Sequence, residues 1–137
     1  MSMHKELHRN YLLISELAVL CIRKNLHLII ENPITQPHYL TLYWCIQPKV
    51  VDKDRTLNGD YMKKPTQFFF INCEPKQNIL FEPIEYVPQR VHERMKVTET
   101  DKSRQVLRSE IHPQYASRFI KQYLIDYETD IEKLMKG

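Results

Sequence analysis

Glycine is almost missing from this chain of 137 residues: Gly59 is the only internal glycine, and Gly137 is the last residue. Loops that cradle a phosphate or a dinucleotide need several glycines, because the backbone must approach the ligand closely. Neither a G-x-G-x-x-G loop nor a Walker-type loop can be built from these residues. The composition therefore excludes a kinase, a P-loop NTPase and a self-contained Rossmann cofactor enzyme.

Long apolar runs and paired cysteines are also missing. The longest unbroken apolar run, residues 17–22, is too short for a transmembrane helix or the core of a signal peptide. The three cysteines, Cys21, Cys45 and Cys73, form no Cys-x-x-Cys pair, which argues against a disulfide framework and a structural zinc site. We therefore expect a reducing, cytoplasmic setting and no membrane partner.

The charge has no strong excess of either sign. Twenty Lys and Arg residues against 17 Asp and Glu residues leave a net charge of +3, unlike a nucleic-acid coat protein or a polybasic membrane anchor. Direct DNA binding should accordingly be weak and steeply dependent on salt. The apolar content of 42% with 27% charged residues is typical of one globular domain, which we expect to span residues 1–137.

Hydrophobic periodicity predicts an α/β protein. Residues 4–24 have helical spacing, and Asn25 stands where a left-handed residue ends a helix. The short aliphatic stretch 26–30 predicts a strand buried on both faces, as in parallel sheets. Residues 48–52 and 66–72 predict two more strands, and residues 38–46 a short helix.

The remaining segments predict loops and a final helix. Residues 53–64 contain the Asn58-Gly59 turn, and residues 74–89 contain three prolines with room for one edge strand. The polar residues 90–110 predict a mobile insertion. Residues 113–134 predict one long helix that begins at Pro113. The expected fold has an N-terminal helix, a short mixed sheet and a long C-terminal helix.

Glu31-Asn32-Pro33 is the sharpest candidate site. It follows the predicted buried strand 26–30, and ligand crevices of open α/β sheets lie at the carboxyl ends of strands. A carboxylate there can accept hydrogen bonds from a planar base or an amine. The competing interpretation is a polar turn in which Asn32 only starts a loop.

Two further segments carry candidate contact residues. In the loop 53–66, paired lysines and a hydroxyl can hold a phosphate, although lysines before an apolar strand also serve only for solubility. The segment before the last helix can likewise act only as a helix cap. The candidates are Arg55, Asp60, Tyr61, Lys63, Lys64, Pro65 and Thr66 in the first segment, and Arg108, Ser109 and His112 in the second.

The ordered set Glu31-Asn32-Pro33, Lys64-Pro65-Thr66 and residues 108–113 resembles the C-terminal half of DNA cytosine-5 methyltransferases, in particular the short phage-encoded branch. The resemblance spans about residues 5–125. It implies a partial Rossmann-like half-domain in which Glu31 holds the edge of the target cytosine. For a base or nucleotide bound at Glu31, we expect Asn32 to position this glutamate and Lys63, Lys64 and Thr66 to serve as backbone or phosphate contacts.

The chain also departs from that family. The family's cofactor loop and its Pro-Cys nucleophile both precede the Glu-Asn motif. Here only 30 residues precede Glu31, they are taken up by the predicted helix 4–24 and the predicted strand 26–30, and no Pro-Cys pair occurs. We therefore expect no methyl transfer by the chain alone, and S-adenosylmethionine only together with a complementing chain. The histidine pair His4 and His8 lacks the H-E-x-x-H order, so we expect no metal site.

Two functions fit these features. The first is a catalytically incomplete methyltransferase-like module that acts by binding a complementing chain or nucleic acid. Half a sheet leaves a strand edge unpaired, so we expect self-association or pairing with the missing half. The second is a phage or mobile-element inhibitor, anti-CRISPR or anti-restriction, that binds a host nuclease through residues 53–64 and 90–108.

Overall fold

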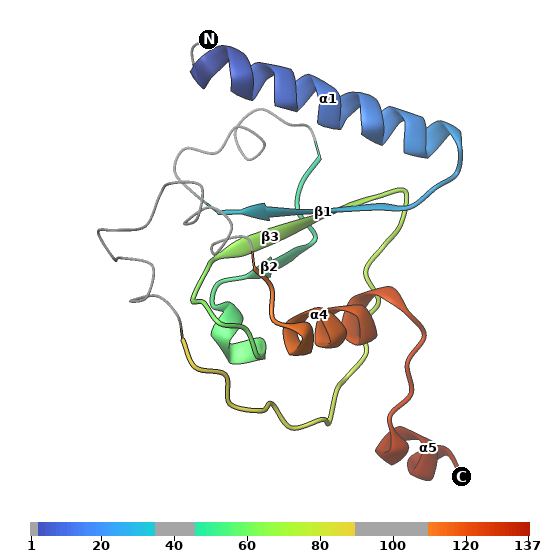
Figure 1. Cartoon of the computed structure of the whole chain (residues 1–137). Coiled ribbons are helices and arrows are strands. Elements are labelled where there is room, and N and C mark those ends of the chain that lie inside the picture. The colour runs from blue at the N-terminus through green and yellow to red at the C-terminus, as the bar shows by residue number, and fades with distance from the viewer. Residues whose placement is uncertain (1–2, 35–45, 90–109) are drawn as a thin grey trace. The chain divides into compact units, whose positions relative to one another are not determined.

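The computed structural model describes residues 3–34, 46–89 and 110–137 (Figure 1). Contacts divide the chain into two compact units. We call Met1–Asp52 with Pro65–Pro75 the sheet unit, and Lys53–Lys64 with Lys76–Gly137 the helical unit. The predicted helix at 38–46 falls almost wholly outside the described residues, and so does nearly all of the predicted insertion at 90–110.

The sheet unit begins with helix α1, Met3–Arg23. Asn25 follows with a φ of 54°, and the Leu26 N–H donates to the Cys21 carbonyl at 2.8 Å. A left-handed residue closes the helix in this way because it turns the chain back and lets a following N–H satisfy one of the last carbonyls. The predicted helix and its stop at Asn25 are both confirmed.

The sheet of this unit has three antiparallel strands: β1 (Leu28–Pro33), β2 (Val50–Asp52) and β3 (Thr66–Ile71). Their order is β1-β3-β2, with Ile30 opposite Phe69 and Val50 opposite Phe68. The three strands and the mixed α/β class are confirmed. The expected mixed sheet with parallel pairing of the first strand is wrong, because all the strand pairs of the described residues are antiparallel. The expected burial of that strand on both faces is also wrong, because β1 is a half-buried edge strand. Its aliphatic run indicates a strand but carries no information on the direction of pairing.

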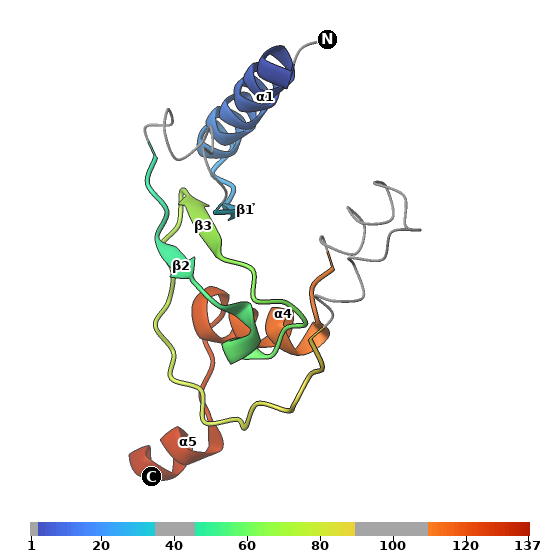
Figure 2. The same ribbon diagram turned by 90° about the vertical axis from the view of Figure 1, so that its left-hand side faces the viewer.

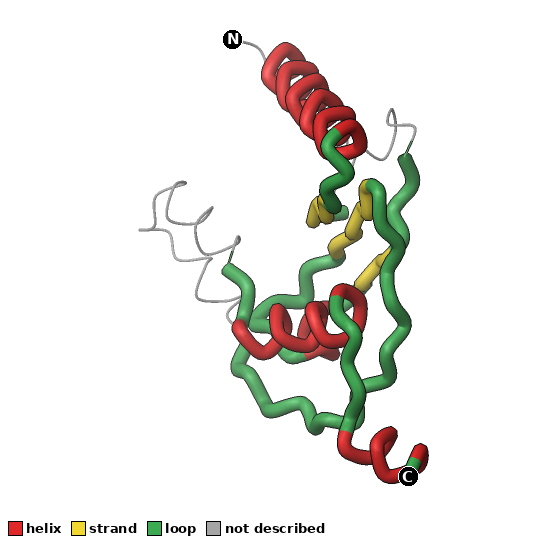
Figure 3. Tube along the Cα trace, turned by 90° about the vertical axis from the view of Figure 1, so that its right-hand side faces the viewer, coloured by secondary structure: helices red, strands yellow, loops and turns green. Residues whose placement is uncertain are grey.

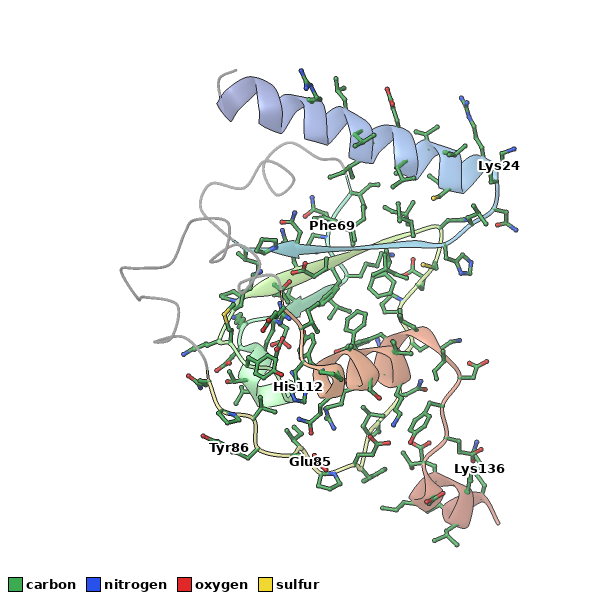
Figure 4. The ribbon with its side chains drawn as sticks, in the orientation of Figure 1. Lys24, Phe69, Glu85, Tyr86, His112 and Lys136 are labelled. Carbon is green, nitrogen blue, oxygen red and sulfur yellow. The ribbon has the colours of Figure 1, made fainter. Side chains whose placement is uncertain are left out.

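The core of the sheet unit lies where α1 meets the sheet. Ala18 of α1 packs with Phe69 and Ile71 of β3, and Leu28 and Ile30 of β1 adjoin them. Figure 4 labels Phe69 in this layer, and Figure 2 shows α1 on the β1 side of the sheet, away from β2. Every residue of β3 is buried, which is why its sequence is the most strongly apolar and β-prone in the chain.

The helical unit contains the 3₁₀ turn η1 (Arg55–Asn58) and three C-terminal segments. These are helix α4 (Pro113–Phe119), the π turn η3 (Ile120–Leu124) and helix α5 (Asp130–Lys136). The single long helix predicted at 113–134 is therefore wrong. The chain becomes extended at Ile125, and Thr129 starts a new helix through a capping box with Glu132. That local cap competes with continuation of the helix.

Residues 76–89 form an extended segment of the helical unit with no helix or strand (Figure 3). Asn78 anchors it, since its side-chain amide donates to the carbonyls of Lys121 and Ile125 at 2.8 and 2.7 Å. The edge strand considered for residues 74–89 is absent from this described segment. Among the described residues, no helix is long and apolar enough to cross a membrane.

Candidate functional site

The two most distinctive motifs of the sequence meet side by side in the sheet unit. Strand β1 pairs with β3 so that Pro33 lies opposite Thr66, and the Ile34 N–H donates to the Pro65 carbonyl at 3.0 Å. Residues more than 30 positions apart therefore form one end of the sheet. This pairing makes Glu31-Asn32-Pro33 and Pro65-Thr66 of the second motif neighbours.

Glu31 is held at this end of the sheet by a direct hydrogen bond. The Thr66 hydroxyl donates to Glu31 Oε1 at 2.5 Å and also lies 3.2 Å from the Asn32 carbonyl oxygen. Thr66 is fully buried, whereas Glu31 is exposed. Within the described part of the chain, Oε2 of Glu31 has no hydrogen-bond partner. The carboxylate is thus oriented at one oxygen and open to a ligand donor at the other.

The Glu31-Asn32-Pro33 motif lies inside β1, not after it as the sequence suggested. Because β1 is antiparallel, the crevice that parallel strands form at their carboxyl ends does not apply here. Asn32 is buried, and its side-chain oxygen accepts from the Gln67 amide at 3.4 Å. Asn32 therefore reinforces the pairing of β1 with β3, which excludes the interpretation as a polar turn.

Replacing Thr66 with valine should test how far this hydroxyl orients Glu31. The change keeps the shape and the β-branching but removes the donor, so we expect the free energy of unfolding to fall by about 1 kcal/mol. Urea denaturation followed by circular dichroism measures it. Thr56→Val is the control, because it removes a hydroxyl in the helical unit and leaves Glu31 untouched. The Thr56 hydroxyl donates to Asp54. An unchanged orientation of Glu31 in a crystal structure of Thr66→Val would contradict the assignment.

A second group of predicted residues gathers in the helical unit. Arg55 and Asp60 form an ion pair with side chains only 2% and 1% exposed, and the Arg55 guanidinium lies 4.8 Å from the centre of the Tyr115 ring. A desolvated pair of this kind is stable only if further groups satisfy its remaining donors and acceptors. The two charges link the loop 53–64 to the helical unit, although Arg55 Nε is buried without a hydrogen-bond partner among the described residues.

Asp60 also accepts hydrogen bonds from two backbone N–H groups. The Tyr61 N–H donates at 2.6 Å and the His112 N–H at 3.1 Å, both to Oδ1. His112 in turn caps α4, because its Nδ1 accepts from the Gln114 N–H at 2.9 Å, and its ring meets the Tyr61 ring edge-on at 4.8 Å. Figure 4 labels His112 at the start of α4. The interpretation of this segment as a helix cap is therefore confirmed for His112.

The other predicted residues are less informative. Lys63 is exposed and Lys64 half-buried, while Pro65 is exposed and contributes the carbonyl already described. Arg108 and Ser109 lie outside the described residues. Of the candidates, the structure brings together Glu31, Asn32, Pro33, Pro65 and Thr66 in the sheet unit, and Arg55, Asp60, Tyr61 and His112 in the helical unit.

Gln114 is a structural residue that the sequence analysis missed. Its side-chain amide donates to the Gly59 carbonyl at 3.4 Å and to the Glu85 carbonyl at 3.0 Å, while its oxygen accepts from the Glu85 N–H at 2.6 Å. A Cβ atom on Gly59 would lie 2.5 Å from this amide, and Gly59 has a φ of 91°. The close approach of Gln114 and the left-handed backbone together explain why residue 59 is a glycine.

Glu82 was also missed. Hydrogen bonds from Lys121 and Tyr127, both at 2.7 Å, lower the pKa of the Glu82 carboxyl group, and the same contacts raise the pKa of Lys121 and of Tyr127. The Glu82 carboxylate therefore stabilises the fold at neutral pH, and this contribution is lost as the pH falls through its lowered pKa. No sequence signal marks Glu82, because its partners lie about 40 residues away.

The chemistry available at the Glu31 site is acceptance of hydrogen bonds. A carboxylate with one oriented and one open oxygen can bind an amino group of a base or an amine. The described residues contain no group of three side chains able to hold a metal ion. No known protein family, curated protein or solved structure matches this chain in sequence or in fold.

Proposed function

We propose that this chain is a catalytically incomplete DNA methyltransferase-like module that acts by binding, with Glu31 as the contact to the edge of a cytosine. The proposal includes a Rossmann-like origin of the sheet unit and a complementing chain that would supply the cofactor loop and the nucleophile. S-adenosylmethionine would then bind only to the combined assembly. The chain itself would contribute the residues that contact the target base.

The hydrogen bond between Thr66 and Glu31 carries this proposal. Two of the three segments that carry the family resemblance, the Glu-Asn-Pro and Lys-Pro-Thr motifs, share a direct side-chain contact at 2.5 Å. The contact is what a base-binding glutamate requires, because a fixed acceptor loses less conformational entropy when it binds.

The open oxygen of Glu31 favours cytosine over thymine. The exocyclic N4 amino group of cytosine donates a hydrogen bond, and a carboxylate is a suitable acceptor for it. Thymine presents the O4 acceptor at the same position, so a carboxylate there is repelled. A base must leave the helical stack to reach the exposed end of β1, and an unpaired base does so at the lowest energetic cost.

Replacing Glu31 with glutamine should weaken binding to a duplex that carries one unpaired cytosine. We expect the wild-type chain to prefer this duplex over one with an unpaired thymine, and Glu31→Gln to reduce its affinity for the cytosine duplex about tenfold. Fluorescence anisotropy with labelled duplexes at low salt measures both. Low salt is required because the net charge of +3 provides little attraction to phosphates.

Glu16→Gln is the matched control, because Glu16 is an exposed glutamate on α1 of the same unit. It removes the same charge and should leave the cytosine preference unchanged. Equal affinity of the wild-type chain for the two duplexes would contradict the base contact. A large loss of thermal stability in Glu31→Gln, with unchanged binding, would instead assign Glu31 to the structure.

A further inference from the structure

Strand β1 presents its outer edge without a partner strand among the described residues. The order β1-β3-β2 places β1 at the end of the sheet, and β1 pairs only with β3. An edge of six residues whose first half is aliphatic is a template for another strand. Proteins that avoid such pairing place charges or prolines along the edge, and here Glu31 and Pro33 stand only in its second half.

The backbone groups that face this edge follow from one hydrogen bond. The Ile34 N–H donates to Pro65 in the neighbouring strand, so residue 34 directs its backbone groups inward. Alternate residues do the same in an antiparallel pair, so Leu28, Ile30 and Asn32 also point inward. The N–H and C=O groups of Ile29 therefore point to the outer edge. The backbone groups of Pro33 also point outward, so the N–H that proline lacks removes no hydrogen bond between β1 and β3.

We propose that a second copy of this chain pairs with this edge, with the two β1 strands antiparallel and Ile29 on the twofold axis. Ile29 then exchanges both backbone hydrogen bonds with Ile29 of the second copy. The two three-stranded sheets become one six-stranded antiparallel sheet. A twofold interface of this kind is isologous, so every cross-strand contact occurs twice.

A hydrogen-bond donor opposite an acceptor selects this register. With Ile29 on the axis, Glu31 of one copy lies opposite His27 of the other. Both side chains are exposed and project from the same face, because they are separated by an even number of residues. The imidazole can donate to the open carboxylate oxygen. On the other face, Leu28 lies opposite Ile30 of the second copy, which extends the apolar layer beneath α1.

Helix α1 provides further exposed apolar surface in the same unit. Leu13, Leu17 and Leu20 are each more than 40% exposed and recur at helical spacing. They belong to the helix that lies on the β1 side of the sheet in Figure 2. Exposed apolar side chains and an unpaired strand in one unit favour a partner that covers apolar surface, and a second copy brings an equal surface. The inference does not rest on the base contact proposed above. The two exclude each other at the open Glu31 oxygen, because that atom would accept either from a cytosine or from the imidazole of the second copy.

Sedimentation velocity of the full chain over a wide concentration range tests the dimer, in the absence of DNA. We expect a reversible dimer with twice the monomer mass of 16.6 kDa. Ile29→Pro should abolish it, because the substitution removes the outward N–H while leaving the ladder between β1 and β3 intact. Ile29→Thr keeps that N–H and the β-branched shape, and should still dimerise. Circular dichroism verifies that both variants remain folded.

Charge exchange tests the register. Each of His27→Glu and Glu31→Lys should raise the dissociation constant of the dimer about tenfold. His27→Glu places like charges opposite each other at two symmetric positions, and Glu31→Lys removes the carboxylate that accepts from the imidazole. The double variant His27→Glu/Glu31→Lys should return it close to the wild-type value. A monomer at every concentration, or a dimer that is insensitive to Ile29→Pro, would overturn the proposal. Failure of the double variant to recover would overturn this register.

Discussion

Replacing Arg55 with methionine should lower the free energy of unfolding by about 3–5 kcal/mol. The substitution leaves the Asp60 carboxylate in a site that is 1% exposed, with two backbone N–H donors but without its cation. An uncompensated buried charge is far more destabilising than the loss of an exposed ion pair. Urea denaturation measures the change, and hydrogen exchange of α4 should show that the helical unit is the part that loosens.

The double variant Arg55→Met/Asp60→Asn separates the buried charge from simple loss of contacts. We expect it to recover a large part of the lost stability, because neither residue is then charged and the asparagine oxygen can still accept from Tyr61 and His112. The double variant should therefore be much more stable than the sum of the two single losses in unfolding free energy predicts. If the loss of stability in the double variant equals the sum of the losses in the two single variants, the ion pair is contradicted.

Lys76→Met is the matched control for charge removal in the same unit. Lys76 pairs with Asp126 at 2.8 Å on the surface, and Asp126 is almost fully exposed. Solvent screens such a pair, so we expect no measurable change in stability. A loss in Arg55→Met as small as that in Lys76→Met would mean that Arg55 is not desolvated in solution.

Replacing Phe69 with alanine should destabilise the sheet unit by about 3–5 kcal/mol. Phe69 is fully buried in the central strand, where it packs with Ala18 and Ile71 and lies opposite Ile30. Removal of the ring leaves a cavity between the sheet and α1 that small neighbours such as Ala18 cannot fill. Thermal and urea unfolding, followed by far-ultraviolet circular dichroism, measure the loss.

Phe81→Ala is the control for the loss of an aromatic ring. Phe81 lies in the extended segment of the helical unit and is 51% exposed, so its removal should have a much smaller effect. Phe69→Leu should recover part of the stability, because it fills some of the cavity. Equal effects of Phe69→Ala and Phe81→Ala would contradict the position of Phe69 in the core.

Local signals predicted the elements whose ends are determined by short-range chemistry. Helix α1 ends where Asn25 takes a left-handed conformation, and β3 coincides with the most β-prone run of the chain. The long C-terminal helix was wrong because its apolar periodicity continues past residue 125. The Thr129 and Glu132 spacing is a capping-box signature that the periodicity obscured.

The Glu31 site was predicted only in part. The sequence marked Glu31 and Thr66 separately, and the family resemblance assigned both to substrate binding. Neither could predict that the Thr66 hydroxyl donates to Glu31, because that contact depends on the register of β1 with β3. Arg55 and Asp60 were predicted as contact residues, but their burial makes them a structural pair.

By itself, the sequence determined where this chain turns, where it can be helical or extended, and which chemistry its scarce glycines and unpaired cysteines exclude. Those properties depend on backbone sterics and on residue types within a few positions. Only the tertiary structure decided that β1 is an antiparallel edge strand, which carboxylate is oriented and which charges are buried. These properties depend on contacts between residues distant in sequence, and no local pattern encodes the direction or the register of such pairing.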